Sequence, residues 1–180
     1  DGTKVMMARY RDAAGNVSAA AIDTIQLDSG LPAGTVSINN GAAYTNNALA
    51  TLTTTTSATD IVAMDVKNAS TLCSDASRTY ATTFSNQVTY TLPGGEGTKT
   101  VYVCYLDRAG NKSAAETTDA IEYDTVAPAI TSVTIPAYSL TTSATITNNV
   151  AHPAGAYEMR FYGDITAVSG GAVGAWKVYA

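Results

Sequence analysis

A stretch of sequence at the start of the chain recurs about halfway along it. Residues 1–18 read DGTKVMMARYRDAAGNVS and match residues 96–113, EGTKTVYVCYLDRAGNKS. The stretch that follows also recurs, because LDSGLP at 27–32 matches YDTVAP at 123–128. A repeat with a nearly fixed period, here about 95 residues, predicts an array of similar folding units.

The repeating unit has the sequence pattern of a small all-β domain. Short runs of alternating apolar and polar residues are separated by turn signals such as Asn39-Asn40-Gly41, and no stretch has a helical period. About seven short strands in one period predict an antiparallel β-sandwich of immunoglobulin type. The strands are expected at 35–38, 48–56, 61–67, 88–92, 99–106 and 117–123, with a small element at 80–84.

The remaining residues predict a second sandwich that is divided between the two ends of the chain. Its first strands are expected at 130–135, 143–148, 157–162 and 174–179, and the tail at 176–180 resembles Tyr90–Gly94. The expected fold is therefore all-β, with tandem antiparallel immunoglobulin-like β-sandwiches. One domain is intact over 29–128, and the split domain is formed by 129–180 and completed by residues 1–28 of the next copy.

Each half of a split sandwich would expose one face of a core and a sheet edge. Burying the hairpin of residues 1–28 would stabilise it by roughly 5–10 kcal/mol, at ~1.5–3 kcal/mol for each inward side chain. The split unit could close on itself, complete a neighbouring copy, or be one period of a longer covalent array. We favour head-to-tail continuation. The side chains expected at this assembly seam are Val5, Met7, Tyr10, Met159, Phe161, Trp176 and Val178.

Charge and composition exclude several classes of function. The formal net charge is −5, and no cluster of basic residues could follow a phosphate backbone, so a nucleic-acid partner is not expected. No apolar run is long enough to cross a bilayer. Charged residues make up only 14% of the chain, and threonine and alanine take their place. Such a surface suits an extracellular stalk or a packed fibre.

The motif at Asp107–Ser113, followed by Asp124–Pro128, resembles tandem bacterial immunoglobulin-like or fibronectin-III-like repeats. Such repeats occur in large surface adhesins and biofilm-associated proteins. The first copy of the motif, Asp12–Ser18, is similar to the same family, and the resemblance covers nearly the whole chain. It implies a sandwich fold and export to the cell surface. The chain departs from the family at Asp28–Pro32 and in a shortened linker at 164–174.

Aspartates are expected to meet where the hairpin of residues 1–28 joins the intact domain. Asp28 ends the hairpin, whereas Asp60 and Asp107 lie in two loops at the facing pole of the sandwich. Three carboxylates form the oxygen-rich environment that calcium prefers, and the resemblance also implies calcium at domain junctions. The alternative is that Asp107 and Asp12 only accept N–H groups within their own turns. The expected cofactor is therefore none, or Ca²⁺.

A corresponding junction in the split unit would use Asp124 and Asp12. Its second-to-third-strand loop holds His152, and not an aspartate, which weakens a metal site there. His152 is the only histidine, and no serine or cysteine pattern near it marks a nucleophile. No catalytic residue is expected, and the chain is not expected to be an enzyme.

The two cysteines are expected to form a disulfide. Alternation places Val101, Val103 and Tyr105 inward, so Cys104 faces outward, and Cys73 lies in a loop that can fold over that sheet. Export favours the bond, and a closed loop of this length would contribute roughly 3–4 kcal/mol. The alternative is two free thiols, since Arg9 occupies the position that matches Cys104 in the other copy.

Three functions are compatible with these features. The first is a non-catalytic structural unit of an extracellular bacterial fibre, stalk or adhesin, whose partners are other copies of itself. The second is an adhesive module that grips a surface glycan or a host protein through some of its 11 tyrosines. The third is an accessory domain of a larger secreted enzyme.

Overall fold

The computed structural model describes residues 1–134, 147–151, 158–161, 163 and 174–178. The described residues form strands, turns and loops and contain no helix, which confirms the predicted all-β class. Consequently no helix in the described part of the chain could cross a membrane. The chain divides into two compact units, Asp1–Thr125 and Val126–Ala180.

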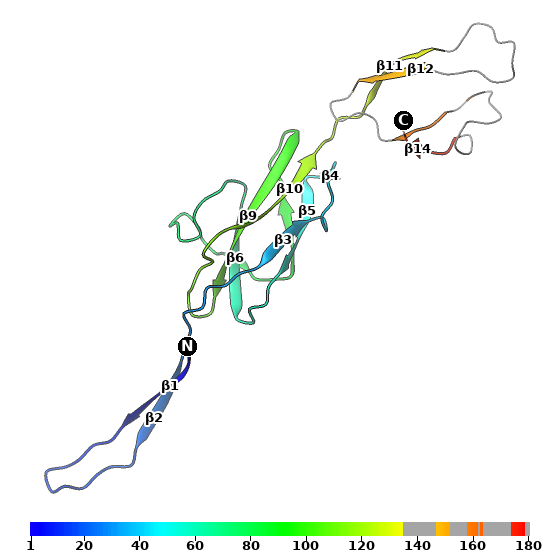
Figure 1. Cartoon of the computed structure of the whole chain (residues 1–180). Helices are drawn as coiled ribbons and strands as arrows, with labels where there is room; N and C mark the ends of the chain where they lie inside the picture. Colours follow the sequence, from blue (N-terminus) through cyan, green and yellow to red (C-terminus); the bar gives the residue numbers. More distant parts are fainter. Residues whose placement is uncertain (135–146, 152–157, 162, 164–173, 179–180) are drawn as a thin grey trace. The chain divides into compact units, whose positions relative to one another are not determined.

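Two sheets form a β-sandwich within the first unit (Figure 1). The smaller sheet has the order β3-β5-β8 and the larger one the order β4-β10-β9-β6-β7. Every pairing is antiparallel except that of β4 with β10, which is parallel. The strands span Thr35–Ile38 (β3), Tyr44–Thr45 (β4), Leu49–Thr55 (β5), Ile61–Lys67 (β6), Thr82–Thr83 (β7), Gln87–Thr91 (β8), Gly97–Asp107 (β9) and Thr117–Tyr123 (β10).

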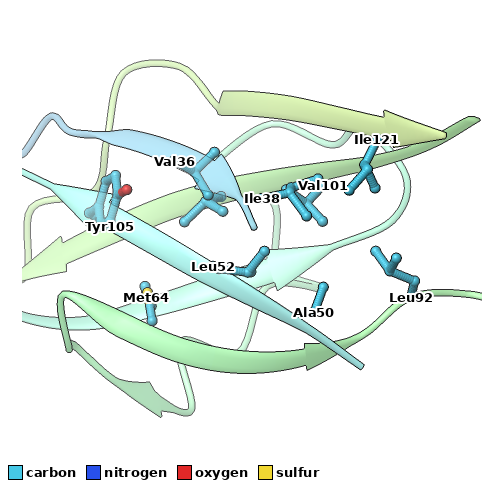
Figure 2. Close-up of a cluster of buried hydrophobic side chains, with 10 residues drawn as sticks. Val36, Ile38, Ala50, Leu52, Met64, Leu92, Val101, Tyr105 and Ile121 are labelled. Carbon is cyan, nitrogen blue, oxygen red and sulfur yellow. The ribbon is translucent and has the colours of Figure 1, made fainter. Parts of the chain in front are cut away.

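Alternating apolar side chains from both sheets fill one core (Figure 2). Each such side chain stabilises the fold by about 1.5–3 kcal/mol when it is removed from water. Tyr105 also carries a polar anchor, because its hydroxyl donates a 2.9 Å hydrogen bond to the carbonyl of Thr35. Burial raises the pKa of Tyr105 to about 12, so the hydroxyl keeps its proton. The buried cluster comprises Val36, Ile38, Ala50, Leu52, Met64, Leu92, Val101, Val103, Tyr105 and Ile121.

A separate antiparallel hairpin precedes the sandwich. It consists of β1 (Gly2–Ala8) and β2 (Ala21–Leu27), and it pairs Gly2 with Leu27 and Met6 with Asp23. The β9–β10 pair has the same register at the matching positions, where Gly97 pairs with Tyr123 and Val101 with Asp119. The sequence similarity of these two segments therefore extends to their strand pairing.

The turns at the ends of the two hairpins share their hydrogen bonds. The N–H of Tyr10 donates to Ser18 Oγ at 2.9 Å, and the N–H of Ser18 donates to the Tyr10 carbonyl at 2.8 Å. Tyr105 and Ser113 form the same two bonds, at 2.9 and 3.0 Å. In this way an identical local scaffold closes both hairpins.

The bases of the two hairpins also match. Asp1 Oδ1 accepts hydrogen bonds from the N–H of Ser29 at 3.0 Å and from its hydroxyl at 2.7 Å. Glu96 accepts the corresponding pair from the N–H and hydroxyl of Thr125. The equivalence of residues 1–29 and 96–125 thus runs from the base of the hairpin to its turn.

The two hairpins differ in what covers them. In β9 and β10, Val101 is 0% and Ile121 is 1% exposed, because the smaller sheet lies over them. Their counterparts in β1 and β2, Met6 and Ile25, are 74% and 70% exposed. An apolar face that is core in one hairpin is therefore open to solvent in the other.

The second unit contains two short antiparallel pairs in its described part. β11 (Ala129–Thr134) pairs with β12 (Thr147–Ala151), with a register shift between Ile130 and Ser132. β13 (Glu158–Met159) pairs with β14 (Lys177–Val178). The strand expected at 143–148 begins outside the described residues, and the linker at 164–173 lies outside them entirely.

The pairing of β14 corrects the sequence prediction for residues 174–179. Met159 pairs with Lys177 as Met64 pairs with Thr82, so β14 corresponds to β7. The predicted match to Tyr90–Gly94, whose first two residues end β8, was wrong. Short runs of aromatic and β-branched residues look alike in every strand, and only the pairing partner distinguishes them. The described part of the second unit therefore contains no strand that corresponds to β8.

Candidate functional site

Three aspartates converge at the base of the sandwich, and we refer to them as the acidic cluster: Asp28, Asp60 and Asp107. Asp28 follows β2, Asp60 precedes β6, and Asp107 ends β9. One carboxylate oxygen of each lies within 4.8 Å of the others. The pairing of β6 with β9 places Ile61 opposite Asp107, which brings the loop of Asp60 beside it.

Asp107 is held by the turn that follows it. Its Oδ1 accepts the N–H of Asn111 at 2.8 Å, and its Oδ2 accepts the side-chain amide of Asn111 at 3.0 Å. Gly110 has a φ of 94°, in the left-handed region that favours glycine, and so allows this tight turn. The turn-capping role weighed from the sequence is therefore present, and it coexists with the convergence of the three carboxylates.

The same turn ties the hairpin to the sandwich. The side-chain amide of Asn111 also donates to the backbone carbonyl of Asp28 at 3.1 Å. The N–H of Arg108 donates to the carbonyl of Asp60 at 3.0 Å. Backbone groups from all three segments of the acidic cluster are thus fixed by one turn, so the carboxylates are held close together despite their like charge.

The close approach of these side chains changes the pKa of Asp60. The pKa of its carboxyl is raised above the ordinary value of 3.8, chiefly by a side-chain hydrogen bond with Asp28 and by burial. The charges of Asp28 and Asp107 raise it further. Neighbouring groups here favour the protonated, neutral form of Asp60. A bound cation would instead stabilise the ionised form by offsetting the nearby negative charge. Carboxylate oxygens are the ligands that Ca²⁺ prefers.

The other predicted metal ligands lie elsewhere. Asp12 caps its own turn, accepting the N–H and the side-chain amide of Asn16, both at 2.8 Å. These bonds, the side-chain one first, lower the pKa of Asp12. The N–H of Asp124 donates to the carbonyl of Thr45 at 3.0 Å. Among the described residues neither aspartate joins a group of three possible ligands, and His152 lies outside those residues.

A loop clamped by a disulfide covers the outer face of the larger sheet. Cys73 and Cys104 are bonded, with their Cα atoms 5.6 Å apart, and both are buried. Cys104 faces away from the core between the inward residues Val103 and Tyr105, as the alternation along β9 predicts. The hydroxyl of Tyr80 donates to the carbonyl of Cys73 at 2.6 Å and so fastens the loop further.

A buried arginine lies under the same loop and was not anticipated from the sequence. Arg78 forms ion pairs with Asp65, at 3.2 Å, and with Glu116. Its guanidinium also donates to the carbonyls of Leu72, at 3.2 Å, and Thr71, at 2.9 Å. Asp65 lies in β6, Glu116 just before β10, and Thr71 and Leu72 in the loop after β6, so no local spacing in the sequence signals the arrangement.

The predicted seam residues lie on the hairpin and the second unit. Tyr10 corresponds to the buried Tyr105, and the register places it on the same face as Met6 and Ala8. Val5 and Met7 lie on the opposite face, at positions that match Thr100 and Tyr102 of β9. In the second unit, Met159 and Phe161 are half-buried and Trp176 and Val178 are exposed. The ring of Trp176 lies 4.4 Å from the guanidinium of Arg160.

Neither a known protein-family model nor a curated protein matches the chain. The candidate sites are the acidic cluster, the loop closed by the disulfide and the exposed face of the β1–β2 hairpin. A hydrogen bond from Asn111 to Asp28 fixes the acidic cluster, and one from Tyr80 to Cys73 fixes the loop. The third is defined by its likeness to a buried hairpin of the same chain.

Proposed function

We propose that the chain is a non-catalytic structural repeat unit of an extracellular bacterial fibre, stalk or adhesin built from immunoglobulin-like sandwiches. One observation carries the proposal. The β1–β2 hairpin has the register and hydrogen bonds of β9–β10, yet its apolar face is exposed. An exposed apolar face of this kind marks a surface that binds a partner. The partner that fits is the remainder of a sandwich.

The second unit supplies strands of the required kind. β11 and β12 form an antiparallel pair, as β3 and β5 do, and β13 with β14 repeats the register of β6 with β7. A hairpin from the next copy would add the counterparts of β9 and β10. This heterologous contact joins different surfaces of two copies and so generates a linear, head-to-tail assembly.

The disulfide supports a location outside the cytoplasm. Disulfides persist in oxidising compartments such as the cell surface and are rare where thiols are kept reduced. The bond between Cys73 and Cys104 also closes a loop over the outer face of the larger sheet. We therefore place the fibre at the cell surface or beyond it.

Calcium at the acidic cluster is part of this proposal. The cluster lies where the hairpin meets the sandwich, and one turn bonds the carboxylate of Asp107 and the backbone carbonyls of Asp28 and Asp60. Because the pKa of Asp60 is raised by its neighbours, a bound cation would relieve their repulsion and stiffen the connection. In a fibre, that connection carries load from one sandwich to the next.

Sedimentation of the purified 180-residue chain tests the proposal. Over a concentration range of roughly 1–200 μM, which brackets the micromolar affinities of modest interfaces, we expect linear oligomers that grow in steps of 18.5 kDa. Electron micrographs of the concentrated sample should show thin filaments. A chain that stays monomeric across the range, or that binds glycans only as a dispersed monomer, contradicts a head-to-tail fibre.

A further inference from the structure

We propose that Asp23 fixes the register in which the β1–β2 hairpin docks on a second copy of the chain. Its carboxylate would accept a backbone N–H near the end of β11 of that copy. This inference rests on the proposed head-to-tail completion, and it adds the group that specifies how the two copies align. The argument begins with the equivalent aspartate in the intact sandwich.

In the intact sandwich, Asp119 joins the two sheets. Its Oδ2 accepts the N–H of Ile38, the last residue of β3, at 2.7 Å. Its Oδ1 accepts the N–H of the adjacent Ala120 at 2.9 Å, which fixes the orientation of the carboxylate. Because β3 and β10 belong to different sheets, this bond sets their relative position along the strands.

Asp23 has the same place in the β1–β2 hairpin. It pairs with Met6 as Asp119 pairs with Val101. Its Oδ1 accepts the N–H of Thr24 at 2.8 Å, which repeats the bond to Ala120. Asp23 is exposed, and its Oδ2 meets no donor in the part of the chain that the structure describes. The carboxylate is therefore already oriented, with one oxygen available.

The donor that corresponds to Ile38 lies near the end of β11. Both β3 and β11 follow a proline, Pro32 and Pro128, and both pair antiparallel with the next long strand. β11 ends at Thr134, as β3 ends at Ile38. A hairpin docked on β11 as β10 lies against β3 would bring Asp23 to this strand end.

A polar contact is needed here because the apolar face alone does not specify alignment. Met6, Ile25 and Leu27 offer apolar surface for burial. Because the hydrophobic effect is not directional, apolar contacts alone would let the hairpin shift along the partner strand. A one-residue slip would turn every side chain to the other face, and a two-residue slip would bury the Asp23 carboxylate without its donor. The penalty for an unpaired buried carboxylate selects one register.

Substitutions in the full chain separate this inference from the proposed function. Asp23→Ala should weaken end-to-end association by roughly tenfold to a hundredfold, as expected for loss of a hydrogen bond to a charged group. Asp23→Asn retains one acceptor oxygen and should weaken the association less than Asp23→Ala does. Thr24→Ala changes the opposite face of β2 and serves as the matched control. The melting temperature of the intact sandwich should be the same in all three variants, because the hairpin lies outside its core.

Met6→Asp provides the test of completion itself, because it places a charge on the apolar face. If Met6→Asp abolishes association and Asp23→Ala leaves it unchanged, the role of Asp23 is overturned and the proposed function stands. If the wild-type chain does not associate, or Met6→Asp has no effect, the head-to-tail assembly fails and the inference fails with it.

Cross-linking locates the contact. The only two native cysteines are bonded to each other, so introduced thiols are the only free ones. The Asp23→Cys and Thr134→Cys variants are mixed at a concentration above the dissociation constant of the weakened complex and treated with a short bismaleimide. The mixture should give a covalent dimer that neither variant gives alone. An associated mixture that yields no such dimer, or a dimer from Asp23→Cys alone, contradicts the proposed register.

Discussion

The carboxylate of Asp119 accepts a 2.7 Å hydrogen bond from the backbone N–H of Ile38 and so links the two sheets of the intact sandwich. The donor belongs to a buried core residue at the end of β3. A buried N–H that loses its acceptor is costly, since it has no water to replace the lost partner. This bond is therefore a structural element of the sandwich as well as the template for the proposed contact of Asp23.

Asp119→Ala should lower the free energy of unfolding of the intact sandwich by about 1–3 kcal/mol, because it leaves the Ile38 N–H without an acceptor. Urea denaturation followed by tyrosine fluorescence measures this loss. Thr118→Ala, at an exposed neighbouring position of β10, should change the value by less than about 0.5 kcal/mol. Equal effects of the two substitutions would show that the hydrogen bond of Asp119 does not contribute measurably to the free energy of unfolding.

Gly34→Ala should destabilise the sandwich by about 1–3 kcal/mol through overpacking. A Cβ at this position would lie 2.7 Å from the carbonyl oxygen of Thr55 and 2.8 Å from the ring of Tyr105. Neither can yield easily, since one is backbone and the other is fixed in the core. Gly94→Ala is the control, because a Cβ there meets nothing within 4 Å. Thermal melts that are the same for both variants would mean that the contact at Gly34 relaxes freely.

Arg78→Ala should cost about 3–5 kcal/mol, because it leaves Asp65 and Glu116 buried without their counter-ion. Burial opposes ionisation of Glu116, but hydrogen bonds from Ser70 and Thr71 and the charge of Arg78 lower its pKa below the ordinary 4.5. With a lowered pKa in the folded state, the contribution of Glu116 is present above pH 4.5 and is lost as the pH falls through the folded pKa. Denaturation curves at a series of acidic pH values should show this loss in the wild type and a smaller one in Arg78→Ala. A variant as stable as the wild type would contradict the structural role of the buried arginine.

Calcium should raise the melting temperature of the chain by several degrees, and Asp60→Asn should remove that response. The pKa of Asp60 is raised, so the metal-free acidic cluster is stabilised by a proton at low pH and loses that stability as the pH rises through the raised pKa. The calcium effect should have the opposite trend and weaken on acidification, since the metal needs ionised carboxylates. Scanning calorimetry with calcium or with a chelator, at a series of pH values, measures the calcium effect and its pH dependence.

Asp75→Asn is the control, because it removes a carboxylate outside the acidic cluster and should keep the calcium-dependent rise in melting temperature. A melting temperature that does not change with chelator would rule out the site.

Much of the sandwich could be anticipated because alternation is a strong signal in long strands. The period of two along β9 assigns Val101, Val103 and Tyr105 to the core and Cys104 to the outer face, as the structure shows. The positions of Asp60 just before β6 and of Asp107 at the end of β9 also follow from strand order. The two-residue strand β4 has no measurable period and was not anticipated.

The errors in the sequence analysis have a common physical origin. The tail was matched to the strand at Tyr90–Gly94 on composition, whereas its pairing with Met159 makes it the counterpart of β7. The ion pairs of Arg78 join its loop to β6 and to the loop just before β10, and no spacing rule encodes such contacts. Long-range pairing is decided by tertiary structure, which local patterns do not specify.

Hydrogen exchange of residues 2–8 and 21–27, measured as a function of protein concentration, tests most directly whether this hairpin is half of a shared sandwich. In dilute solution the exposed hairpin should exchange quickly, while β9 and β10 remain protected by their core. At concentrations that produce oligomers, the hairpin amides should gain protection approaching that of β9 and β10, together with amides of β11. Rapid exchange of the hairpin at every concentration, in a sample that nevertheless forms oligomers, would contradict completion of the split sandwich.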